Sequence, residues 1–140
     1  MRKISSIIIH CSYTMPSMDI GVVEIRDWHT EPPRNWSDIG YHYVIRRNGE
    51  IEAGRDESVV GAHAKGMNKN SLGVCLIGGR AEDGGNENNF TQDQFHALAG
   101  LLGDLCWQHD DPDILGHYDV PNSGKTCPNF DVQKFLEDTA

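Results

Sequence analysis

The order of apolar and polar residues predicts a chain in which short strands alternate with helices. Residues 5–10 form a β-branched run that predicts a buried strand. Residues 20–30 place apolar side chains at helical spacing, and the Pro32-Pro33 pair should stop that helix. Residues 71–78 are largely apolar at successive positions, which is typical of a central strand covered on both faces.

Turn signals and shorter apolar runs add a hairpin and two further elements. Asn48-Gly49 is typical of a type I′ turn, so we expect a hairpin between strands at 41–47 and 50–53. Residues 113–116 read as a last short strand, and residues 131–137 as a C-terminal helix.

The strongest helical pattern begins near Thr91. Thr91 and Gln94 resemble a capping box, and Phe90 with Phe95 resembles a hydrophobic staple. One apolar stripe then runs along the helix: Phe95, Leu98, Leu102, Leu105 and Cys106.

These elements together predict an α/β fold in a single domain that spans residues 1–140. The order strand, helix, hairpin, strand, helix, strand, helix predicts a central mixed β-sheet flanked by α-helices. Two predicted strands run into a histidine, His10 and His117. Ligands of open α/β sheets bind at the carboxyl ends of strands, so this end of the sheet is the expected functional edge.

The composition is that of an acidic globular protein. Of 140 residues, 38% are hydrophobic and 24% are charged, and the net charge is −9. This charge argues against nucleic-acid binding and against electrostatic docking on an anionic membrane. The apolar runs are far shorter than the ~20 residues that span a bilayer, so no membrane insertion is expected. The N-terminus has no signal-peptide pattern, and synthesis in the cytoplasm is therefore expected.

The cysteines exclude the common compact metal motifs. The four are Cys11, Cys75, Cys106 and Cys127, and no two of them form a Cys-x-x-Cys pair. A zinc ribbon or a thioredoxin-like motif is therefore excluded, and reduced thiols are expected. Cys11, Cys75 and Cys106 lie in predicted strands and the long helix, where they are interpreted as buried thiols.

A metal site would have to combine residues that are distant in sequence, and one such set stands out. His10, His117 and Cys127 would give three nitrogen and sulfur ligands with one open position, as in catalytic zinc sites. The segment between His117 and Cys127 is rich in Pro, Asn, Ser and Gly and can fold back on itself. From spacing alone this signal is weak, and surface or packed histidines with a buried cysteine are the more common arrangement.

Seven short motifs, in a fixed order, point to a known family. They are Ile9-His10-Cys11-Ser12, Gly40-Tyr41-His42-Tyr43, Gly54-Arg55-Asp56, Gly61-Ala62-His63, Ser71-Leu72-Gly73-Val74-Cys75-Leu76, Gly116-His117-Tyr118-Asp119 and Lys125-Thr126-Cys127-Pro128. The set resembles the zinc-dependent N-acetylmuramoyl-L-alanine amidases of the peptidoglycan-recognition family, and within it the phage and prophage endolysins. The resemblance extends from about His10 to Phe135.

The resemblance implies a cofactor, a reaction and roles for particular residues. It implies one zinc ion per chain, held by His10, His117 and Cys127. It implies catalytic assistance from Tyr41 and Lys125, and it places His63 in the groove that takes the peptide stem of murein. Members of the family hydrolyse the amide between the lactyl group of N-acetylmuramic acid and L-alanine.

The residue types suit that reaction. Amide hydrolysis needs a strong nucleophile and a sink for negative charge, and a catalytic zinc ion supplies both. Lys125 lies two residues before a proposed ligand and could donate to the developing oxyanion, while the Tyr41 hydroxyl could orient water or donate to the tetrahedral intermediate. Arg55 could bind a substrate carboxylate, or it could pair with Asp56 or Glu57.

The resemblance also implies a partner and a setting. Peptidoglycan is the implied partner, the protein is expected to be a monomer, and an endolysin would reach the wall through a separate pore. Some phage relatives inhibit RNA polymerase through a surface that includes a longer N-terminal segment. Only nine residues precede His10, so this inhibition is not expected here. Because a charge of −9 opposes encounter with anionic murein, recognition must be local.

Two other classes of function compete with the enzyme. Some family members bind murein without cutting it and typically lack the cysteine ligand, whereas Cys127 and Lys125 are both present here. A purely structural zinc would need a fourth protein ligand, for which Cys11 and His42 are the nearby candidates.

Overall fold

A five-stranded mixed sheet forms the centre of the protein, which a computed structural model describes over residues 2–139. The strands are β1 (Ser6–Cys11), β2 (Tyr43–Ile45), β3 (Ile51–Ala53), β4 (Ser71–Leu76) and β5 (Asp113–Gly116). Their order across the sheet is β3-β2-β4-β1-β5. Only β3 runs antiparallel to its neighbour, so the predicted mixed sheet is confirmed.

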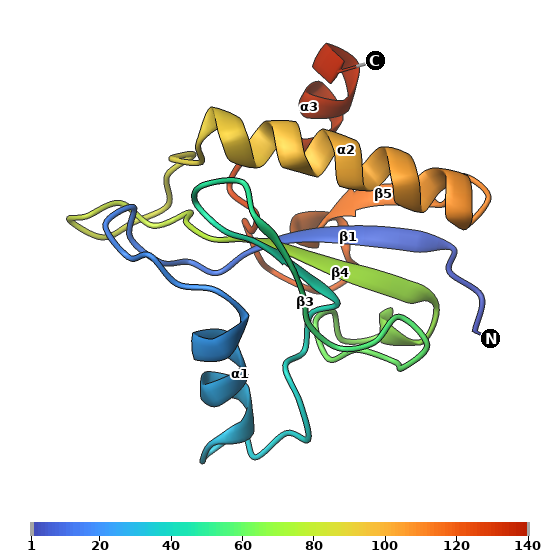
Figure 1. The fold of residues 1–140 in the computed structure, drawn as a ribbon, viewed down its shortest axis with the longest axis horizontal. Helices are drawn as coiled ribbons and strands as arrows, with labels where there is room; N and C mark the ends of the chain where they lie inside the picture. The colour runs from blue at the N-terminus through green and yellow to red at the C-terminus, as the bar shows by residue number, and fades with distance from the viewer. Residues whose placement is uncertain (1, 140) are drawn as a thin grey trace.

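Within the described residues, three helices and two short 3₁₀ turns surround the sheet. The helices are α1 (Val22–Thr30), α2 (Gln92–Gln108) and α3 (Val132–Thr139), and the turns are η1 (Asn68–Asn70) and η2 (His117–Asp119). The long helix α2 lies along one face of the sheet, with α3 beyond it, and α1 lies on the other side (Figure 1). Within residues 2–139, no helix is both long and apolar enough to cross a membrane.

The two faces of the sheet bury different side chains. Ile7 and Ile9 of β1 pack in the cluster that α2 covers through residues such as Leu98. Because side chains alternate along a strand, Ile8 and His10 point to the opposite face. Ile8 packs there in a separate cluster, and both side chains are almost completely buried. The sequence pattern of β1 therefore directs His10 away from α2.

Helix α2 is fixed to the sheet at its first turn. The predicted capping box is present, because the Thr91 hydroxyl accepts from the backbone N–H of Gln94 and the Gln94 side chain accepts from Thr91. The Gln94 amide is fully buried and donates to the carbonyl groups of Ile45 and Ile77. Cys106 is only half-buried, and Leu101 takes a buried place that the predicted stripe did not include.

The hairpin is confirmed, but the predicted type I′ turn is wrong. That turn needs positive φ at both central residues, whereas only Gly49 has it, at +89°. The N–H of Gly49 donates to the Arg46 carbonyl, and the N–H of Arg46 donates to the Glu50 carbonyl. The connection is therefore a three-residue loop that ends in a left-handed glycine, and its two strands are shorter than predicted.

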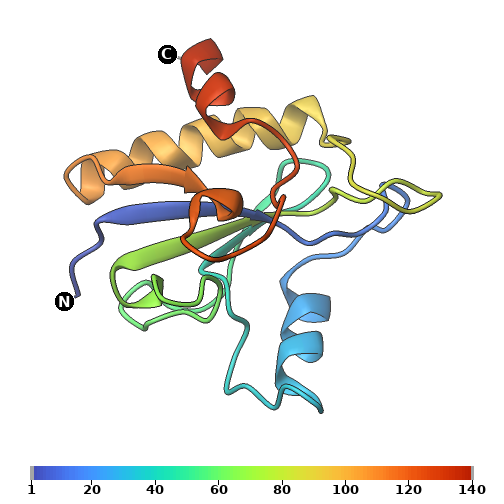
Figure 2. The ribbon, with the colours of Figure 1, turned by 180° about the vertical axis from the view of Figure 1, so that it is seen from behind.

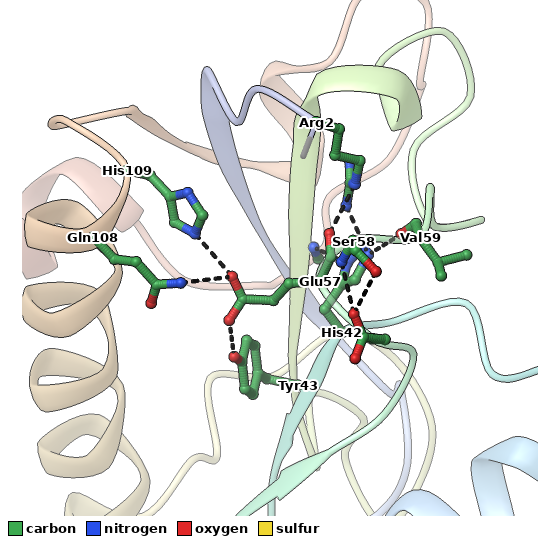
Figure 3. A network of polar contacts seen from close by, with 10 residues as sticks. Arg2, His42, Tyr43, Glu57, Ser58, Val59, Gln108 and His109 are labelled. Carbon is green, nitrogen blue, oxygen red and sulfur yellow. Dashed lines mark hydrogen bonds and ion pairs between the residues drawn. The ribbon is translucent and has the colours of Figure 1, made fainter.

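A polar network joins the far end of α2 to β2. Figure 3 shows the Glu57 carboxylate between His109 and Gln108 at the end of α2 and Tyr43 of β2. The Nε2 atom of His109 lies 2.8 Å from the carboxylate, and the Tyr43 hydroxyl donates to it. Arg2 donates to the backbone carbonyl of Glu57, so the N-terminal segment is held at the same point.

Candidate metal centre

The register of the sheet brings His10 and His117 together. β1 and β5 are neighbouring parallel strands, and Ile9 is paired with Gly116. The residue after each of these two is a histidine, so both rings emerge at the same edge of the sheet. Their ring centroids are 4.5 Å apart, and the Nδ1 atoms are 3.2 Å apart.

The segment after β5 folds back and adds Cys127. The N–H of Tyr118 donates to the carbonyl of Cys127 at 3.0 Å, which closes the loop between the two predicted ligands. The Cys127 Sγ atom accepts from the backbone N–H of Cys11 at 3.0 Å. Figure 2 shows η2 and the loop after it beside the carboxyl end of β1.

His10, His117 and Cys127 form a group that could hold a metal ion. One ligand atom from each residue lies within 4.8 Å of the others, and no other such group of three or more His, Cys, Asp or Glu residues occurs in residues 2–139. Two imidazole nitrogens and one sulfur are the donor types that zinc prefers. The three atoms therefore fit zinc in both chemistry and spacing.

The protonation states of the two histidines suit metal binding. Burial, with the nearby His63 and His117 rings, lowers the pKa of His10 well below its ordinary value. Burial and the Lys125 ammonium lower the pKa of His117. Both rings are thus neutral near pH 7 and offer lone pairs. The hydrogen bond with the Cys11 thiol, together with burial, raises the pKa of Cys127, so a cation is needed to favour its thiolate.

A cleft of about 900 Å³ opens beside this group. It is lined by Trp36, residues 62–68, His117, residues 120–123 and Lys125. Among the described residues that line it, none is acidic, and the two charged ones are Lys65 and Lys125. An electropositive cleft in a protein of net charge −9 is consistent with the local recognition that the sequence predicted.

Tyr41 lies against His10. It precedes β2 by two residues instead of standing in a strand, although its carbonyl still accepts from Arg55 in the manner of the hairpin ladder. Its ring centroid is 5.1 Å from that of His10. Burial, followed by the thiols of Cys75 and Cys127, raises the pKa of Tyr41 well above its ordinary value. Its hydroxyl therefore keeps its hydrogen and can act as a donor.

Lys125 and His63 line the cleft beside His117, whereas Arg55 does not. The Lys125 side chain is exposed. His63 is 7% exposed, and burial lowers its pKa to about 3. The Arg55 guanidinium donates to the backbone carbonyls of Ile39, Asp38 and Val60, so it fastens loops and pairs with neither Asp56 nor Glu57. Its contact with a substrate carboxylate stays a prediction without support from this geometry.

The two candidates for a fourth protein ligand, His42 and Cys11, differ in their contacts. Both ring nitrogens of His42 are engaged, since Nδ1 accepts from Gly73 and Nε2 lies 2.8 Å from the Val59 carbonyl (Figure 3). Cys11 is buried, as expected, but its backbone contacts Cys127 at the end of β1, because its N–H donates to the Cys127 Sγ atom.

Known proteins match this chain in sequence and in fold. The family model for N-acetylmuramoyl-L-alanine amidase matches residues 1–130. The endolysin of Escherichia phage T7 is 46% identical over 132 residues, which cover 94% of this chain and 85% of that protein. The N-acetylmuramoyl-L-alanine amidase LysC from Clostridium intestinale has a TM-score of 0.83 at 29% identity, covering 98% of this chain and 85% of that chain. Drosophila PGRP-LB has a TM-score of 0.75 at 27% identity, covering 100% and 82%. The chain therefore belongs to the N-acetylmuramoyl-L-alanine amidase family.

Proposed function

We propose that this protein is a zinc-dependent peptidoglycan hydrolase of the endolysin type. It cleaves the amide between the lactyl group of N-acetylmuramic acid and L-alanine. The observation that carries the proposal is the group His10, His117 and Cys127 beside an electropositive cleft, in a chain that belongs to an amidase family. The intact ligand set, with Lys125 in the cleft, supports catalysis over recognition alone.

One zinc ion per chain would be held by His10, His117 and Cys127. When bound, zinc supplies a nucleophile at neutral pH and polarises the scissile carbonyl. Three protein ligands leave a coordination position open, which supports a catalytic role over a structural one.

The two catalytic residues that we propose act through hydrogen bonds and charge. Lys125 lines the cleft beside His117, where its ammonium can donate to negative charge that develops on the carbonyl oxygen. Tyr41 lies against His10 as a protonated phenol, so it can donate to the tetrahedral intermediate or hold the attacking water by its oxygen. Lys125 lies in the same loop as Cys127, two residues before it.

The setting follows from the same proposal. The protein acts as a monomer, and peptidoglycan is its partner. As an endolysin, it would be made in the host cytoplasm and would reach the wall through a separate pore.

Removal of the metal should abolish murein hydrolysis. Because only three protein residues hold the ion, a strong chelator should remove zinc from the protein. Added zinc should restore activity, because the fold does not depend on the metal. The measurement is dye release from labelled murein, with zinc content determined on the same preparation. Full activity in protein shown to be metal-free would contradict the proposal.

Charge reversal at Lys65 should weaken the binding of murein. Lys65 is an exposed residue of the cleft, and an exposed ion pair is worth up to about 1 kcal/mol, so Lys65→Glu should raise KM about fivefold with little change in kcat. The matched control is Lys69→Glu, an exposed lysine of η1 outside the cleft lining. Added salt should reduce the difference in KM between the two variants, because it screens exposed charges. Equal KM values for the two variants would show that Lys65 does not face the substrate.

A further inference from the structure

A row of hydrogen bonds runs from the metal centre into the start of β4. The Nδ1 atom of His63 lies 2.9 Å from Nε2 of His10, and the Nε2 atom of His63 lies 3.2 Å from Oγ of Ser71. The Ser71 hydroxyl donates to the carbonyl of Met67 at 2.7 Å. His10, His63 and Ser71 are 1%, 7% and 0% exposed, so water has little access to these bonds.

The carbonyl at the end of the row fixes the direction of every bond in it. A carbonyl can only accept, so the Ser71 hydrogen is used on Met67 and the Ser71 oxygen accepts from His63. The hydrogen of the neutral His63 ring is therefore on Nε2, and its lone pair is on Nδ1. That lone pair accepts from Nε2 of His10.

The consequence reaches the metal centre. With its hydrogen on Nε2, the neutral His10 ring has its lone pair on Nδ1. This is the atom that lies 3.2 Å from Nδ1 of His117. The opposite tautomer of His10 would place a hydrogen where a metal ligand is needed.

We propose that His63 and Ser71 are positioning residues, which hold His10 in the tautomer that binds zinc through Nδ1. The inference rests on the proposed zinc site and gives His63 a role other than contact with the peptide stem. Metal-bound histidines usually donate their second N–H to a carboxylate, a backbone carbonyl or water. Here a second histidine, itself oriented by a serine, takes that place.

Two glycines leave room for the His63 ring in this orientation. A Cβ atom at Gly73 would lie 2.5 Å from Cγ of His63, and one at Gly61 would lie 2.8 Å from its Cδ2. The His63 backbone is also fixed, because its N–H donates to the Asn68 side chain. Gly73→Ala should therefore displace the ring without removing any polar group.

The direct test is the tautomer of His10 in the full-length, zinc-loaded protein. Long-range ¹H–¹⁵N correlation spectra distinguish a metal-bound nitrogen from one that carries hydrogen. We expect zinc on Nδ1 of His10, with hydrogen on Nε2 of both His10 and His63. Zinc on Nε2 of His10, or hydrogen on Nδ1 of His63, would overturn the proposal.

Variants test the same row through zinc affinity, measured by competition with a chelator. Loss of such supporting residues typically costs 10- to 100-fold in metal affinity. We expect about 10-fold for Ser71→Ala and up to 100-fold for His63→Phe, which keeps an aromatic ring but neither nitrogen. His63→Asn offers an amide oxygen near the Nδ1 position and should recover most of the affinity.

The zinc-affinity test has a matched control and a defined contrary outcome. His96→Ala removes an exposed histidine of α2 and should leave zinc affinity unchanged. Unchanged affinity in folded Ser71→Ala and Gly73→Ala would overturn the proposal, and these variants decide the matter if His63→Phe does not fold. Neither readout needs murein cleavage. An inactive protein with zinc on Nδ1 of His10 would contradict the proposed function alone, and a protein that binds no zinc would contradict both.

Discussion

Replacing Cys127 with serine should strip zinc from the protein and reduce murein hydrolysis to background. A serine hydroxyl is neutral and hard at this pH, whereas a thiolate is a strong zinc ligand. Loss of supporting residues alone costs 10- to 100-fold in metal affinity, so loss of a ligand should cost at least about 100-fold. The fold should survive, because the buried faces of the sheet and α2 do not involve Cys127. The mutant should therefore still sediment with insoluble murein.

Three measurements on one preparation test this expectation: zinc content, dye release from labelled murein, and co-sedimentation with it. Cys106→Ser is the matched control, since Cys106 is a half-buried thiol of α2 outside the metal group. Near-normal dye release by Cys127→Ser would show that Cys127 is not a ligand. Global unfolding would show instead that the ion is structural.

Lys125→Ala and Tyr41→Phe should each lower kcat about 100-fold while the zinc content stays unchanged. Each substitution removes a donor that we expect to act on charge developing in the transition state, and such a donor is typically worth about 3 kcal/mol. Steady-state kinetics on murein fragments, with zinc determined in parallel, separates a loss of catalysis from a loss of metal.

Lys134→Ala and Tyr13→Phe are the controls, because both side chains are exposed and neither lines the cleft. A Lys125 or Tyr41 variant that loses zinc in proportion to its activity would show that the residue supports the metal site instead of the reaction.

Most of the secondary-structure elements could be predicted from local sequence patterns. The β-branched run of β1, the capping box of α2 and the position of β5 are short-range signals, and each element was predicted to within about two residues at its start. The hairpin loop was less predictable, because Asn48-Gly49 favours several turn types and the neighbouring strands decide among them.

The closeness of His10 and His117 could be predicted in part, because both residues follow predicted strands, whereas the ligand set with Cys127 was implied by the family resemblance. Histidines that follow two neighbouring parallel strands must emerge at one edge, and the register of β1 against β5 brings His10 and His117 together. The contact of His63 with His10 could not be predicted in this way. It depends on the packing of the His63 ring against Gly73 of β4 and against His10 of β1, and these three residues are far apart in the sequence.

The contacts of Arg55 could not be predicted from local sequence patterns either. A cation in a motif near the site suggested a carboxylate partner, yet its guanidinium is engaged by backbone carbonyls. Those acceptors depend on how the loops at Ile39 and Val60 close, which no local pattern encodes.

The chemical identity of the products from digested murein tests the central claim most directly. Digestion by the zinc-loaded protein should release new amino termini of L-alanine in step with loss of turbidity, without new reducing sugar ends. Those products would establish cleavage between the lactyl group and L-alanine. New reducing ends without new L-alanine amino termini would contradict the account, because they would mean that the protein cuts the glycan and is not an amidase.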